Sequence, residues 1–123
     1  MKQNGKWQKE NYAGKRGVKI QDLAISIPGW YQVKTRKSGW LPPVTGYNIK
    51  DSINGYAGDG SDILDVRVYL VTPNPPPYYK AKYRVSAVNK AYYPYQYDTE
   101  TTNRQDGYAG DHVPIDRFSL KVV

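Results

Sequence analysis

Cysteine is absent from this 123-residue sequence, and histidine, methionine and phenylalanine each occur once. Without cysteine the chain has no disulfide and no thiolate metal site. With His112 as its only histidine and no Ser-His-Asp context, it lacks the parts of a zinc site and of a catalytic triad. We therefore expect neither a metal nor another cofactor.

Glutamate is also scarce, since Glu10 and Glu100 are the only two. Glycoside hydrolysis needs a pair of carboxyl groups, and the acid of the pair needs surroundings that raise its pKa. Both glutamates lie in polar stretches, so we expect no enzyme here. Residues 59–62 (DGSD), with Asp65 beyond them, look like half of a calcium loop without its later bidentate acid. This difference favours a structural turn.

Long apolar runs are missing as well, and none approaches the roughly 20 residues that a membrane-spanning helix needs. Lysine and arginine number 18 against 11 acidic residues, and the net charge of +7 favours polyanionic partners. Nucleic acid, anionic lipid and anionic wall polymers all qualify. Thirteen tyrosines and three tryptophans supply flat apolar faces with polar tips, which recognition surfaces favour.

A Tyr-Ala-Gly unit occurs three times, at residues 12–14, 56–58 and 108–110. Each unit precedes a segment in which apolar residues recur at every second position, the period of a strand with one buried face. These residues are Leu23/Ile25/Ile27, Val66/Val68/Leu70 and Phe118/Leu120/Val122. The sequence therefore predicts an internal repeat of strands.

The repeats span residues 1–28, 29–73 and 78–123 approximately, within one domain. The second and third match without a gap at an offset of 52, whereas the first is abbreviated and lacks the opening strand expected at 31–35 and 83–87. We predict an all-β fold of three related antiparallel units, each with its own small sheet. Their expected arrangement is pseudo-threefold, of the β-prism or trefoil kind, and a two-sheet β-sandwich is the alternative.

Several segments of the second and third repeats carry a resemblance to a known family. They are residues 39–48 (GWLPPVTGYN), 54–58 (NGYAG), 82–85 (KYRV), 97–103 (YDTETTN) and 105–110 (QDGYAG). Together they resemble the C-terminal cell-wall-binding domains of clostridial phage endolysins, and more loosely the clostridial hydrophobic repeats built on a Gly-Trp pair. The resemblance implies a non-catalytic module that attaches a muramidase or amidase to the peptidoglycan or a secondary polymer of the host wall.

The same resemblance implies a location in the host cytoplasm before lysis and on the host wall afterwards. The expected partners are wall glycan or secondary polymer, parent endolysin chains and further copies of this chain. Met1 before a basic stretch fits either an internal translation start within an endolysin gene or an engineered start. An unpaired edge at the abbreviated first repeat predicts self-association. Its expected contact residues are Ile25, Ile27 and Trp30.

A wall-binding site needs aromatic planes beside short polar side chains, because sugar rings present C–H patches next to hydroxyls. The polar segments 43–55 and 95–107 are the expected recognition loops. The predicted ligand-binding residues are Trp40, Tyr47, Asn48, Asp51, Tyr92, Tyr93, Tyr95, Tyr97, Asn103 and Asp106. Trp40 and Tyr92 have an equal alternative as core residues of a hairpin.

Five further cations can meet phosphate or carboxylate on a wall polymer or can simply form a solvated surface: Lys34, Arg36, Lys37, Lys50 and Arg104. The alternative function is that of a basic, aromatic-rich domain that binds single-stranded nucleic acid by stacking and charge. A third class, an assembly module that holds lysin chains together, is compatible with wall binding.

Overall fold

The protein is built from short and long β-strands. Its structure, a computed structural model, describes residues 2–3, 6–7, 12–13, 16–71, 79–102 and 104–123. The strands are β1 (Lys2–Gln3), β2 (Lys6–Trp7), β3 (Tyr12–Ala13), β4 (Ile20–Leu23), β5 (Gly29–Thr35), β6 (Gly39–Trp40), β7 (Ala57–Gly58), β8 (Ile63–Leu70), β9 (Ala81–Ala87), β10 (Gln96–Tyr97), β11 (Ala109–Gly110) and β12 (Ile115–Val122). The described residues contain no helix, so the all-β prediction is confirmed. Among these residues there is accordingly no helix that could cross a membrane.

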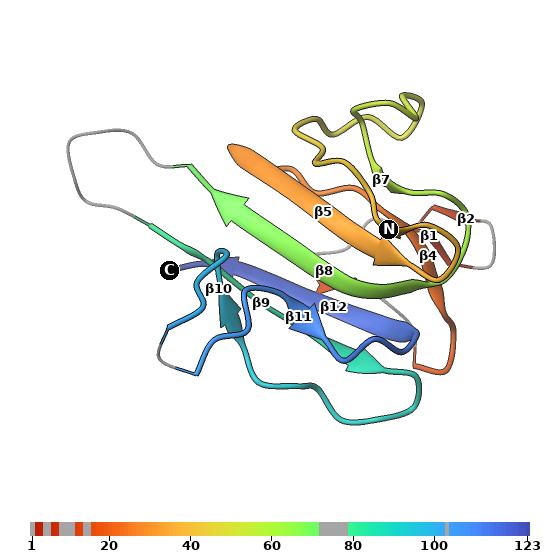
Figure 1. Cartoon of the computed structure of the whole chain (residues 1–123). Coiled ribbons are helices and arrows are strands. Elements are labelled where there is room, and N and C mark those ends of the chain that lie inside the picture. Colours follow the sequence, from red (N-terminus) through yellow and green to blue (C-terminus); the bar gives the residue numbers. More distant parts are fainter. Residues whose placement is uncertain (1, 4–5, 8–11, 14–15, 72–78, 103) are drawn as a thin grey trace.

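The strands form three antiparallel sheets of four strands each among the described residues (Figure 1). Sheet A has the order β2-β1-β4-β7, sheet B the order β10-β9-β12-β3, and sheet C the order β11-β8-β5-β6. The longest pairings are β5 with β8 and β9 with β12, which lie side by side in Figure 1. Three sheets are one more than the alternative two-sheet sandwich has.

Each sheet takes one strand from another repeat, which corrects the prediction that every repeat forms its own sheet. The Tyr-Ala-Gly strand β7 of the second repeat pairs with β4 of the first. In the same way β11 of the third repeat pairs with β8 of the second, and β3 of the first pairs with β12 of the third. The three exchanges therefore form a closed cycle.

The first repeat has a short opening strand, so the prediction that it lacks one is wrong. Strand β1 pairs with β4, with Lys2 opposite Asp22 and Gln3 opposite Ile20. The second repeat shows the same pattern, in which β5 pairs with β8 around Asp65 and Ile63. Local alternation could not reveal a strand of only two residues, because it spans a single period.

One cluster of buried side chains contains members of all three repeats. The predicted alternation holds best in the second repeat, where Val66, Val68 and Leu70 are all buried. It weakens towards the end of β12, where Val122 is 51% exposed although Phe118 is buried. The apolar pattern therefore continues past the point where the sheet still covers the core.

Two buried aspartates join the repeats at equivalent places. Asp22 on β4 accepts a hydrogen bond from the backbone N–H of Gly60 at 3.3 Å. Asp65 on β8 accepts one from the backbone N–H of His112 at 3.1 Å. In both cases the donor lies two residues after the glycine of the next Tyr-Ala-Gly strand. The buried carboxylates thus stabilise the exchanged strands.

Candidate ligand-binding surface

The outward face of sheet B carries a group of cations. In β9, buried Tyr83 and Val85 alternate with Lys82 and Arg84, which are half-buried. This alternation directs Lys82 and Arg84 away from the core. Lys121 on β12 stands directly opposite Lys82 in the register of the two strands. Three cations from two neighbouring strands therefore share one face.

Tyrosines from the segment after β9 lie beside these cations. The guanidinium carbon of Arg84 is 4.2 Å from the ring centre of Tyr92 and 4.4 Å from that of Tyr95. The Lys82 ammonium is 4.5 Å from the ring centre of Tyr95 and 5.6 Å from that of Tyr97. All four distances fall within the roughly 6 Å reach of a cation–π attraction. One continuous network results.

Two further cations complete this network. The Lys121 ammonium is 5.6 Å from the ring centre of Tyr95, and the Arg117 guanidinium is 4.8 Å from that of Tyr92. We name the whole set the tyrosine–cation strip. It consists of Lys82, Arg84, Tyr92, Tyr95, Tyr97, Arg117 and Lys121.

Little acidic charge balances the strip. Arg117 has a carboxylate partner, because its Nε lies 3.4 Å from Asp116 Oδ1. For Lys82, Arg84 and Lys121, the described part of the chain offers no carboxylate within ion-pair distance. The Nε atom of Arg84 is also buried without a hydrogen-bond acceptor there. Within the described residues, the strip therefore carries three positive charges without an ion-pair partner.

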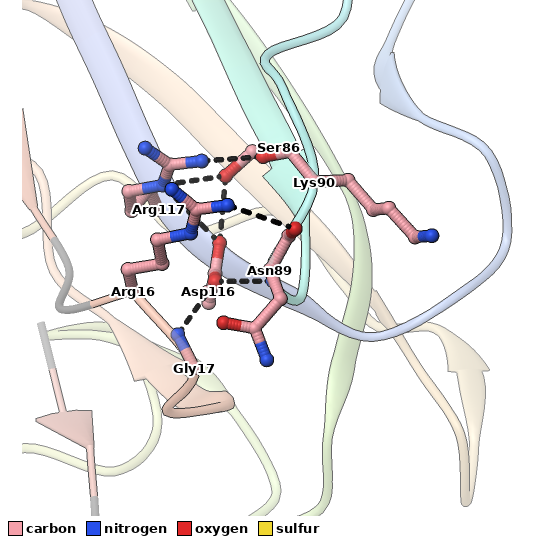
Figure 2. Close-up of polar contacts among 7 residues, drawn as sticks. All are labelled: Arg16, Gly17, Ser86, Asn89, Lys90, Asp116 and Arg117. Carbon is pink, nitrogen blue, oxygen red and sulfur yellow. Dashed lines mark hydrogen bonds and ion pairs between the residues drawn. The ribbon is translucent and has the colours of Figure 1, made fainter.

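Asp116 anchors the Arg117 end of the strip, as Figure 2 shows. Its carboxylate accepts hydrogen bonds from the Ser86 hydroxyl at 2.6 Å and from the backbone N–H groups of Gly17 and Asn89, each at 2.8 Å. Arg117 Nε donates to the same Ser86 oxygen at 3.0 Å. Since Gly17 belongs to the first repeat, this contact also joins the first repeat to the third.

The ionised form of Asp116 is favoured at this junction. Burial opposes ionisation, but the hydrogen bonds from Gly17, Ser86 and Asn89, together with the positive charge of Arg117, outweigh burial. They hold the pKa of Asp116 below its ordinary value. Asp116 is therefore an anion at neutral pH and fixes both the strip and the junction between repeats.

Trp40 lies on sheet C, apart from the strip. Its ring centre is 4.4 Å from the guanidinium carbon of Arg67 and meets Tyr108 edge-on at 5.8 Å. Arg67 also donates a hydrogen bond to Gln32 Oε1 at 3.0 Å. The ring of Trp40 thus makes contacts within the chain, as its alternative interpretation as a structural hairpin residue requires.

The loop at 45–55 exposes Tyr47 but uses its polar side chains internally. Asn48 Oδ1 accepts a hydrogen bond from the backbone N–H of Lys50 at 3.0 Å. Asp51 Oδ1 accepts two, from the backbone of Ile53 at 3.0 Å and of Asn54 at 3.2 Å. Asn48 and Asp51 therefore support the turn, while the ring of Tyr47 is 50% exposed on it.

The remaining predicted ligand-binding residues have different surroundings. Tyr93 packs against the core, and burial raises the pKa of its phenol. Asp106 exchanges hydrogen bonds with Gln96, since its N–H donates to Gln96 Oε1 at 2.9 Å. Asn103 lies outside the described residues. Of the predicted residues that the structure describes, Tyr92, Tyr95 and Tyr97 are therefore the ones that come together around the cations of sheet B.

The residues predicted to mediate self-association are less available than expected. Ile25 is buried, with 6% of its surface exposed, so its placement at an exposed edge is wrong. It points inward because the core extends beyond the end of β4. Ile27 is partly buried against the same core, and Trp30 stacks on Tyr69 with their ring centres 5.8 Å apart.

The segment that looked like half of a calcium loop forms a hydrogen-bonded turn. Asp59 accepts hydrogen bonds from the hydroxyls of Thr35 at 3.0 Å and Ser38 at 2.7 Å. Asp62 forms ion pairs with Lys19 and Arg36, each at 3.5 Å. These contacts give both carboxylates structural partners. Among the described residues, no group of three metal-ligating side chains comes together.

The sequence did not predict the contact between Asp65 and His112. His112 Nδ1 lies 2.7 Å from the buried Asp65 Oδ2, and the Tyr108 hydroxyl lies 3.2 Å from His112 Nε2. These residues are 47 positions apart in the chain, so no local motif could indicate the pair. Their contact reinforces the junction between the second and third repeats.

The sequence also gave no prominence to Lys82, Arg84, Arg117 and Lys121. A signal for them was available, because Lys82 and Arg84 alternate with Tyr83 and Val85 in a short strand. Their clustering with tyrosines depends on strand register, which sequence alternation leaves open.

In comparisons with protein-family models, curated proteins and solved structures, none matches this chain.

Proposed function

We propose that this chain is a non-catalytic binding module that attaches a phage endolysin to the wall of a clostridial host. The observation that carries the proposal is the tyrosine–cation strip, where three cations that have no acidic partner among the described residues lie beside three tyrosines on one sheet face. Bacterial walls offer anionic polymers and glycan to such a surface. The resemblance of residues 39–48, 54–58, 82–85, 97–103 and 105–110 to endolysin wall-binding domains supports the same conclusion.

We propose a pseudo-threefold arrangement of the β-prism kind as the scaffold. Its support is the closed cycle in which every Tyr-Ala-Gly strand pairs with the long strand of a neighbouring repeat. Because the three repeats differ in their outward residues, such a scaffold can present one surface rather than three equal ones. The strip belongs to the third repeat.

We propose that the module acts without hydrolysing its ligand. Glu100 is held by Lys80 in an ion pair of 2.9 Å, and Glu10 lies outside the described residues. The Asp65 and His112 pair serves the junction between repeats through both the backbone and the side chain of His112. The module would then be present in the host cytoplasm before lysis and on the wall afterwards.

Binding to single-stranded nucleic acid is the second candidate, and the strip is the observation that favours it. Spacing in the sequence spreads charge over all repeats, but sheet B gathers four cations on one face. Proteins that bind single-stranded nucleic acid combine aromatic rings with neighbouring cations. The coverage of the ring faces by Arg84 and Lys82 is the feature that weighs against it.

Sedimentation with purified clostridial walls tests the proposed function. We expect the purified protein to sediment with the walls and to leave their turbidity unchanged. Protein that stays in the supernatant would contradict wall attachment, whereas a clearing wall suspension would contradict the non-catalytic role. Walls of an unrelated bacterium serve as the control for host preference.

A further inference from the structure

The tyrosine–cation strip places like charges side by side, with no described carboxylate to neutralise them. Lys82 and Lys121 are directly opposite each other on neighbouring strands. At such positions Cβ atoms stand about 5 Å apart, and like charges destabilise the sheet. No described acidic residue forms an ion pair with either lysine. An anion from outside the chain would remove this repulsion.

The spacing of the cations suits a ligand with repeated charges. Residues two positions apart on a strand are separated by about 7 Å, which applies to Lys82 and Arg84. Lys121 lies on the neighbouring strand, about 5 Å to the side of Lys82. The charged groups of these three residues all lie within 5.6 Å of the Tyr95 ring centre. A flexible polymer with an anionic group in each unit can place several of those groups beside them.

The guanidinium of Arg84 is arranged to meet an oxyanion. It lies over the rings of both Tyr92 and Tyr95. A guanidinium over an aromatic face keeps its N–H donors in its own plane, and that plane fits the paired oxygens of a phosphate. The described residues provide no acceptor for Arg84 Nε. The side chain is therefore positioned by tyrosines and left unneutralised.

The tyrosines of the strip hold cations rather than offering open faces. Arg84 covers part of Tyr92 and Tyr95, and Lys82 covers part of Tyr95 and Tyr97. Single-strand binders need open rings on which successive bases stack. A sugar ring that stacks on an aromatic face has the same need. These observations favour a charged polymer over stacked bases or sugars.

We infer that the strip binds a polymer whose negative charge comes from phosphate groups and which carries no aromatic bases. This inference rests on the proposed function, since it identifies the wall ligand. It selects a phosphate-linked secondary wall polymer over the glycan strands of peptidoglycan. The binding groups are Lys82, Arg84 and Lys121, and the tyrosines set their positions.

Long-chain inorganic polyphosphate is the first probe, because it contains phosphate without sugar or base. With three cation contacts, the logarithm of the binding constant should fall against the logarithm of salt concentration with a slope of about −2, at about 0.7 per contact. The variants Arg84→Gln and Lys82→Gln/Lys121→Gln should bind about tenfold more weakly and with a shallower slope.

The matched control for the double variant is Lys37→Gln/Lys50→Gln, which removes the same two charges from exposed residues outside the strip, and Lys37→Gln alone is the control for Arg84→Gln. We expect the affinity of each control to stay within about twofold of the parent chain, because it loses only general attraction. Circular dichroism during thermal unfolding shows whether each variant keeps the fold. An equal loss in the control and strip variants, with folds intact, would overturn the inference.

Clostridial walls before and after hydrofluoric acid removes their phosphate-linked polymers are the second probe. Loss of binding to the treated walls supports the inference. Equal binding to both preparations overturns it and leaves the proposed function standing. Absence of binding to either preparation, together with strip-dependent binding of polyphosphate, contradicts the proposed function and supports a phosphate-polymer site. Binding of oligo(dT) at least tenfold tighter than polyphosphate would overturn the inference in favour of nucleic acid.

Discussion

Replacing Gly110 with alanine should test the cycle of exchanged strands directly. Gly110 has φ of +127°, and an added Cβ would lie 2.2 Å from Asp65 Oδ1. The backbone conformation alone costs an L-residue about 1–2 kcal/mol. The clash must also displace the buried Asp65 carboxylate from its hydrogen bonds to His112, and leaving such a group unsatisfied costs about 1–3 kcal/mol. We expect Gly110→Ala to lose about 2–5 kcal/mol in all.

Urea unfolding measures this loss in the free energy of unfolding. An unchanged slope of that free energy against urea concentration shows that the unfolded state is the same in both proteins. Gly60→Ala is the matched control, because Gly60 has φ of +82° but its added Cβ would meet nothing within 4 Å. We expect that control to lose only about 1–2 kcal/mol. If Gly110→Ala loses no more than Gly60→Ala, the carboxylate contact does not hold the exchanged strand. In that case the double variant Gly110→Ala/Asp65→Ala should lose the sum of the two single losses in the free energy of unfolding, which means no coupling between the two sites.

Three further predictions concern acid stability, the exposed rings and self-association. The lowered pKa of Asp116 means that its contribution is present above the ordinary value of about 4 and is lost as pH falls through the folded-state value. Asp116→Asn should therefore cost about 1–3 kcal/mol at neutral pH and reduce the acid-induced loss seen in urea unfolding; an unaltered pH profile would contradict this. Tyr97→Ala should weaken wall binding by about 0.5–2 kcal/mol at unchanged melting temperature, because Lys82 loses a ring that positions its ammonium. Tyr47→Ala should weaken wall binding by about 1–3 kcal/mol, by analogy with base stacking, because its exposed ring lies outside the strip. Full binding by both variants would refute their role. Light scattering over a dilution series should show a species above 14.0 kDa that is lost on Ile27→Lys while circular dichroism shows the fold retained, since Ile27 also packs against the core. A monomer at every concentration, or loss of the larger species only through unfolding, would contradict self-association.

Local pattern was enough to predict the class of the fold. Alternation at Val66, Val68 and Leu70 indicates a strand with one buried face, and these residues are buried in β8. The same alternation includes Ile25, which is buried. The prediction that Ile25 lies at an open edge came instead from the abbreviated first repeat, and it is wrong. Periodicity identifies which residues of a strand share a face, but it does not say how far the core extends beneath that strand.

The candidate site was predictable only in part. Tyr92, Tyr95 and Tyr97 stand out because aromatic residues in a polar segment are unusual. Arg84 looks like an ordinary surface charge until the pairing of β9 with β10 brings the tyrosines beside it. The pairing of β9 with β12 then places Lys121 beside Tyr95, which is 26 positions away in the chain.

The sequence by itself determined the threefold repeat, the strand character of each long segment and the excess of positive charge. Those properties follow from residue type and short-range spacing, which do not depend on the tertiary contacts of the chain. Only the tertiary structure decided that β7, β11 and β3 pair with other repeats and that Asp22, Asp65 and Asp116 hold those junctions. It also decided that Arg84 lies over Tyr92 and Tyr95. These outcomes depend on strand register and on contacts between distant residues. Many strand pairings are compatible with the same local pattern, and only the packing of one core selects among them.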